Sequence, residues 1–263
     1  MTAADLEPMS WLTDHTLLPA EPWVLLIALV GAACIGMSKA GLAGTATLNV
    51  VIMAKIFGAK PSVGVVLPML IVADFLGFMI NRGGGSWRKV WPMVPPAVAG
   101  VLVGWLLLDR IDNATARVVI GWLILTLLAF NVVLDRRREQ LLALTRHRTF
   151  AWGMGWTAGC TTMLANAAGP VMTVYLLSQR LEKSEHLGVF SRFFLFINLF
   201  KLPFSGNVGL VTAKSLLTNA VLLPGVLAGV ALGWWILRRT GQRAFETTLA
   251  WLTAFAAVWL IAG

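Results

Sequence analysis

Charged residues are scarce in this chain. They make up 13% of its 263 residues, whereas soluble domains carry roughly 25%. Apolar residues make up 58%, and they fall in long runs separated by short charged stretches. A soluble fold of this length could not bury so much apolar surface. The composition therefore excludes a soluble domain and predicts an all-α integral membrane protein.

Residues that bind metals or act as nucleophiles are also few. The chain has two cysteines and three histidines; Cys34 and Cys160 lie inside apolar runs, and the histidines lie near the ends of runs. This gives no disulfide framework and no metal-ligand spacing. The apolar runs contain no Ser–His–Asp or Cys–His set and no phosphate loop. We expect no metal, no cofactor and no enzymatic activity. A membrane-embedded enzyme and a non-transporting scaffold are the weaker alternatives.

The first 21 residues contain no lysine or arginine and carry four acidic residues instead. A cleavable signal peptide begins with positive charge. We therefore expect residues 1–21 to form a short extracytoplasmic tail.

Ten apolar runs follow this tail. They cover residues 22–37, 45–57, 61–80, 90–108, 114–134, 149–163, 167–179, 187–204, 215–237 and 244–262. A full crossing needs about 20 helical residues, a length that only the last three runs of each half reach or approach. The first two runs of each half are shorter, and breaks at 36–44 and 165–170 separate them. Irregular backbone at membrane depth is tolerated only inside protein or beside a wet cavity. We predict that each short pair is a re-entrant hairpin or two half-helices.

The number of runs predicts an inverted repeat. Five runs in each half turn the second half upside down relative to the first. We therefore predict two transmembrane repeats, 22–134 and 149–263, joined by a basic cytoplasmic linker at 135–148. Each repeat would contain a broken or re-entrant helix pair followed by three transmembrane helices.

Lysine and arginine are unevenly distributed between the runs. In this topology thirteen of them fall on one side of the membrane and five on the other. Short cytoplasmic loops are rich in these residues, so the richer side is expected to be the cytoplasm. Both termini would then lie outside it. The net charge of +9 is explained by these loops and does not indicate a nucleic-acid partner.

Ionisable residues at membrane depth mark a candidate site, because a charge at the bilayer centre is costly. Lys39 lies in the first break, and Asp74 lies two-thirds along the third run. Lys201 lies just before Pro203, which is expected to end or kink its helix. Lys39 could instead form a structural ion pair with Asp74, and Lys201 could snorkel to the outer interface. Asp74 would tune the charge of the site or carry a proton. Arg192, close to the start of its run, is expected to snorkel to the cytoplasmic surface.

The two breaks add a second kind of anion site. Thr45 and Pro170 lie where the second half-helix of each pair begins; Thr45 suits an N-cap, and Asn166 lies close enough to help cap the other helix. Two half-helix N-termini would then point toward the protein centre with free N–H groups. Close helix packing is the alternative role for the glycines of the breaks. The glycines that would let a ligand approach the backbone are Gly41, Gly44 and Gly169.

At these residues the sequence resembles the TauE/SafE family of sulfite-exporter-like membrane proteins. The resemblance rests on residues 36–44, 61–64, Leu67-Pro68 and Asp74, on 165–170 with Thr173 and Tyr175, and on Phe193-Phe194 followed by 198–203. It covers nearly the whole chain from about residue 23. The second break departs from the family's usual Gly-rich run, because this chain has Asn166-Ala-Ala-Gly169 there.

The resemblance implies export, or at least movement, of sulfite, sulfonates or related organic anions across the bacterial cytoplasmic membrane. Members lack an ATP-binding domain, so a proton gradient or the membrane potential would drive transport. We therefore predict a secondary transporter of a small anion. The predicted binding residues are Lys39, Gly41, Gly44, Thr45, Asn166, Gly169, Asn198 and Lys201. The alternative is a carrier of a cation or neutral solute that uses Asp74 as ligand and Lys39 as counter-charge. Transport direction and oligomeric state, a homodimer included, stay open.

Overall fold

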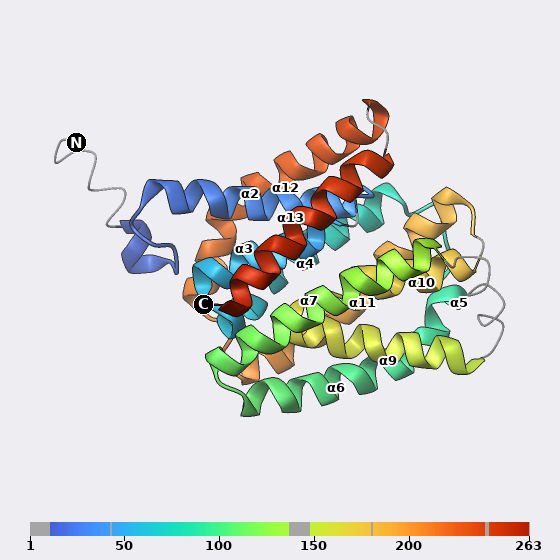
Figure 1. The fold of residues 1–263 in the computed structure, drawn as a ribbon, viewed down its shortest axis with the longest axis horizontal. Helices are drawn as coiled ribbons and strands as arrows, with labels where there is room; N and C mark the ends of the chain where they lie inside the picture. Colours follow the sequence, from blue (N-terminus) through green and yellow to red (C-terminus); the bar gives the residue numbers. More distant parts are fainter. Residues whose placement is uncertain (1–10, 43, 137–147, 180, 240–241, 263) are drawn as a thin grey trace.

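A computed structural model describes residues 11–42, 44–136, 148–179, 181–239 and 242–262, and these form helices, short turns and no strands (Figure 1). The helices are α2 (Pro22–Lys39), α3 (Thr45–Phe57), α4 (Ala59–Ile80), α5 (Trp87–Val90), η1 (Trp91–Met93), α6 (Val94–Arg110), α7 (Asn113–Arg136), α9 (Arg148–Ala165), α10 (Gly169–Ser178), α11 (Lys183–Asn207), α12 (Ala213–Arg239) and α13 (Gln242–Ala262). Nine of the ten predicted runs each overlap one of these helices, and the run 90–108 covers the end of α5, η1 and most of α6. Most of the predicted linker, 135–148, lies outside the described residues.

Several helices are long and apolar enough to cross a membrane. The described residues contain six candidate spans: Pro22–Lys39, Ala59–Ile80, Trp87–Arg110, Asn113–Phe130, Ser184–Asn207 and Ala213–Ile236. The prediction of an all-α membrane protein is therefore confirmed. Two of the boundary differences affect the candidate site. α2 continues to Lys39 instead of ending at residue 37, and α11 passes through Pro203 to Asn207.

The two halves of the chain interlock. α2 packs along α12, and α9 packs along α6, while α4 and α11 lie against each other between these pairs (Figure 1). The first helix of each half thus packs on the fourth helix of the other half. A two-fold relation between the halves would produce this pairing. The inverted orientation of the halves stays a prediction.

Glycines allow these helix pairs to approach closely. A Cβ atom on Gly36 of α2 would lie 2.1 Å from the carbonyl oxygen of Val226 in α12. A Cβ atom on Gly159 of α9 would lie 2.0 Å from the carbonyl oxygen of Ala97 in α6. Both distances are far below van der Waals contact with backbone that cannot move aside. Close helix packing therefore requires glycine at both positions.

Left-handed residues end the first helix of each short pair. Gly41 has φ 118°; its N–H donates to the Ser38 carbonyl, and the next N–H donates to the Met37 carbonyl. These two bonds form a Schellman motif, which favours glycine. Asn166 follows α9 with φ 54°, a conformation that asparagine tolerates better than most residues. Both helices therefore stop inside the protein with their last carbonyl groups partly satisfied.

Arg192 does not snorkel. It is 6% exposed, and its guanidinium donates to the backbone carbonyls of Arg82, Gly84 and Gly188. The side chain therefore ties the loop after α4 to the first turns of α11. The expectation of a surface-directed arginine was wrong because the Gly-rich loop folds over this helix and offers carbonyl acceptors.

Candidate functional site

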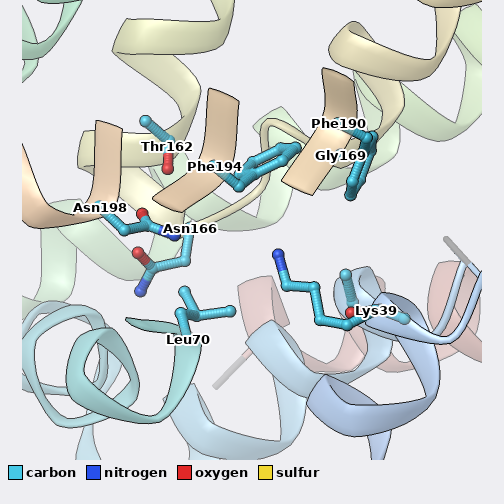
Figure 2. Close-up of a pocket in the computed structure, with 10 residues that line it drawn as sticks. Lys39, Leu70, Thr162, Asn166, Gly169, Phe190, Phe194 and Asn198 are labelled. Atoms are coloured by element: carbon cyan, nitrogen blue, oxygen red, sulfur yellow. The ribbon is translucent and has the colours of Figure 1, made fainter. Parts of the chain in front are cut away.

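A small cavity lies where the two breaks meet (Figure 2). Residues from α2, α3, α4, α9, α10 and α11 line it: Ser38, Lys39, Ala46, Leu70, Thr162, Asn166, Gly169, Phe190, Phe194 and Asn198. Its volume is about 20 Å³, which accommodates roughly one water molecule. The cavity therefore brings both halves of the chain to one polar point in this conformation.

Lys39 borders this cavity and also forms a buried ion pair. Its Nζ lies 2.6 Å from Oδ1 of Asp74. The same ammonium lies 4.3 Å from the ring centroid of Phe194 and 5.6 Å from that of Phe190. Figure 2 shows the side chain extending from α2 toward the residues of α9 and α11. The ion pair that was the structural alternative for Lys39 is therefore formed, and the same amine faces the cavity.

Asp74 is fully buried, and both of its carboxylate oxygens have partners. Oδ1 pairs with Lys39, and Oδ2 accepts a hydrogen bond of 2.7 Å from Nδ2 of Asn198. Asp74 is not one of the cavity-lining residues. A buried carboxylate is stable only when paired and hydrogen-bonded, because removing a partner leaves an uncompensated charge.

Lys201 is fully buried, so the snorkelling alternative was wrong. Its Nζ donates to the Thr162 carbonyl at 2.7 Å and to Oδ1 of Asn166 at 2.6 Å. Longer contacts reach the Thr162 hydroxyl at 3.1 Å and Oδ1 of Asn198 at 3.4 Å. Because α11 continues beyond Pro203, Lys201 lies more than a turn from the helix end and points into the bundle.

The amide of Asn166 joins the second break to α4. Its Oδ1 accepts from Lys201, and its Nδ2 donates at 2.9 Å to the carbonyl of Val63. Lys201 therefore determines which end of the amide faces α4. The expected contribution of Asn166 to an N-cap of α10 is not what its side chain does.

The first break contributes differently from the prediction. The hydroxyl of Thr45 donates to the carbonyls of Cys34 and Leu42, each at 2.8 Å, so Thr45 is not the N-cap of α3. Ala46, one residue later, lines the cavity in its place. Gly169 lines the cavity from α10, so the first turns of α3 and α10 both border it. The cavity-lining residues do not include the other predicted residues of the first break: Gly41, Gly44 and Thr45.

Several lining residues were missed. Ser38 directly precedes Lys39, and Thr162 precedes Asn166 by one helical turn, so helical spacing could have identified both. Phe194 lies one turn before Asn198 on α11 and Phe190 lies two turns before it, so both share its face. No sequence signal separates Leu70 or Ala46 from the apolar residues around them.

The ionisable groups of the site are two lysines and one aspartate. Lys39, Lys201 and Asp74 lie within one hydrogen-bonded network that Asn198 connects. With all three ionised, the network carries one net positive charge. Within the described ranges, no group of three or more His, Cys, Asp or Glu side chains could hold a metal ion.

Among known proteins, a family model described as "Sulfite exporter TauE/SafE" matches residues 24–260. No curated protein and no solved structure matches the chain significantly.

Proposed function

The chain belongs to the TauE/SafE family of sulfite-exporter membrane transporters, and from that membership we propose that it carries a small anion such as sulfite or an organosulfonate. Export from the cytoplasm is the proposed direction. A proton gradient or the membrane potential would supply the energy.

One observation carries this proposal. Both breaks, from opposite halves of the chain, converge on one cavity, and the three ionisable side chains beside it, Lys39, Lys201 and Asp74, carry one net positive charge when all are ionised. A net charge in the membrane interior is costly unless a counter-charge compensates it. A bound anion would provide that compensation.

Lys39 is the proposed direct contact of the anion. It borders the cavity, and its ammonium would exchange part of its interaction with Asp74 for the bound anion. Further donors are available nearby in the backbone N–H groups of the first turns of α3 and α10, where the helix dipoles favour negative charge. The proposed anion site is completed by the polar side chains of Thr162, Asn166 and Asn198, which also line the cavity.

The size of the cavity bears on the transport cycle. At about 20 Å³ it accommodates a single water molecule and is too small for sulfite, which has four non-hydrogen atoms. We therefore infer that the anion enters when helices around the cavity separate. α11 is the proposed moving element, because it carries Phe190, Phe194 and Asn198 on one face.

A carrier of cations or neutral solutes is less well supported. Oδ1 of Asp74 already forms an ion pair with Lys39 and Oδ2 accepts a hydrogen bond from Asn198, and Asp74 does not line the cavity. A cation would have to approach past the ammonium of Lys39. The arrangement favours an anion.

Anion flux into proteoliposomes tests the proposal. We expect saturable flux of sulfite or a small sulfonate, with its rate changed by an imposed proton gradient or membrane potential. Lys39→Ala should abolish this flux. Lys55→Ala is the matched control, because Lys55 lies on α3 over the ring of Trp259 and away from the cavity. Wild-type flux in a folded Lys39→Ala protein would contradict the site.

A further inference from the structure

Lys201 contacts residues that line the cavity but does not line it itself. Its acceptors Thr162, Asn166 and Asn198 all line the cavity, whereas Lys201 does not. All oxygens within hydrogen-bonding distance of its Nζ in the described part of the chain belong to neutral groups. An ammonium has only donors, and these acceptors match it. Lys201 thus contributes a positive charge to the site without being placed to touch an anion.

The ion pair of Asp74 with Lys39 determines whether the positive charge of Lys201 is compensated within the site. The charged groups that act on Asp74 are Lys39 from α2 and Lys201 from α11; Asn198, also from α11, contacts it through its amide. Lys39 and Asp74 neutralise each other at 2.6 Å. The charge that remains is that of Lys201.

We propose that Lys201 is a positioning residue that sets the charge of the transported anion at −1. This inference rests on the proposed function and deepens it. A monovalent anion at Lys39 brings the buried set of Lys39, Lys201 and Asp74 to neutrality without any proton. While Lys39 turns toward the anion, Asp74 retains Lys201 as its counter-charge through Asn198.

Replacing Lys201 with methionine should change the proton balance of binding. In Lys201→Met the unliganded set is neutral, so binding a monovalent anion leaves one negative charge in the protein interior. Asp74 would then take up a proton from solution, its carboxylate becoming a carboxyl group. We expect methanesulfonate to bind on the order of tenfold more weakly than to wild type, with uptake of about one proton per anion.

A second substitution should reverse this effect. Lys201→Met/Asp74→Asn restores one excess positive charge, now on Lys39. We expect the double variant to regain most of the lost affinity and to bind without proton uptake. A merely structural role for Lys201 would make the double variant worse than the single one. Lys55→Met is the matched control for loss of a lysine outside the cavity.

Calorimetric titration of the full chain in detergent, in two buffers of different ionisation enthalpy, measures both affinity and proton uptake. Wild-type binding of methanesulfonate without proton uptake, together with the pattern above for both variants, supports the inference. Proton uptake by wild type, or a Lys201→Met defect that Asp74→Asn does not reverse, overturns it while leaving anion transport standing. Failure of wild type to bind any small anion removes the proposed function and this inference with it.

The single variant Asp74→Asn keeps the inference testable if Lys201→Met does not fold. It should carry two excess positive charges, so its affinity for sulfate relative to methanesulfonate should rise above the wild-type ratio. An unchanged ratio would overturn the inference.

Discussion

Asn198 donates a hydrogen bond of 2.7 Å from its Nδ2 to Oδ2 of Asp74, across the contact between α11 and α4. Each of the two residues lies on the third helix of its half, and both are fully buried. The bond therefore joins the two halves at the charged centre of the site.

Loss of this bond should destabilise the fold. In Asn198→Leu, Oδ2 of Asp74 would be a buried acceptor without its donor, which costs about 1–3 kcal/mol. Thermal unfolding in detergent measures this loss. Leu199→Ala, a change on the exposed side of the same helix, is the control. Equal melting temperatures for the two variants would show that the bond contributes nothing.

Gly159 should not tolerate even one added carbon. In Gly159→Ala the new Cβ would lie 2.0 Å from the Ala97 carbonyl oxygen and force α9 away from α6, at a cost of roughly 1–3 kcal/mol or more. Flux should fall as well, because α9 carries Thr162 and precedes Asn166. Gly153→Ala on the same helix is the matched control, since a Cβ there has no neighbour within 4 Å. Equal stability and flux in the two variants would contradict the predicted clash.

Asn166 combines a backbone role with a side-chain role, and two substitutions separate them. Asn166→Gly keeps the left-handed conformation and loses the amide, whereas Asn166→Ala loses both. We expect Asn166→Ala to be less stable than Asn166→Gly by about 1 kcal/mol. Both should transport poorly, because the acceptor of Lys201 is gone. Wild-type flux in Asn166→Gly would exclude a role for the amide.

Sulfite offers a test that methanesulfonate does not. It gains or loses a proton near neutral pH, whereas methanesulfonate stays monovalent. If the site accepts one negative charge, binding sulfite from alkaline solution should take up about one proton, and binding methanesulfonate should take up none. Proton uptake measured with a pH electrode in weak buffer distinguishes the two. Equal uptake for both anions would contradict a site of fixed charge.

Asp112 should make stability depend on pH at the start of α7. Its Oδ1 accepts from the Thr115 N–H at 2.8 Å, and the hydrogen bonds from Thr115 lower the pKa of Asp112 below its ordinary value of 3.8. A depressed pKa means that the stabilisation is complete above the ordinary value and is lost as pH falls through the folded one. Asp112→Asn keeps an N-cap acceptor without titrating. Below about pH 4, the melting temperature of wild type should therefore fall more steeply than that of Asp112→Asn; parallel curves would exclude this contribution.

Much of the helix pattern could be predicted from the sequence, because long apolar runs and Gly-rich breaks are local signals. The meeting of Lys39 with Asp74 and of Asn166 with Lys201 was harder to predict. Each of these contacts joins residues that are 35 apart in the chain, and no local pattern reports them. Lys201 shows the difficulty: a proline two residues later suggested a helix end, but tertiary packing carried the helix through it.

The interlocked helix pairs also have a consequence for biosynthesis. α9 is synthesised soon after α6, so this pair can form early. The partner of α2 is α12, which is synthesised near the end of the chain, so this pair can form only late. Until then, the glycine-bearing face of α2 has only lipid, other early helices or the insertion machinery to cover it. The first half synthesised alone would therefore expose that face permanently. α2 is therefore among the first helices to be inserted and among the last to be covered by its partner.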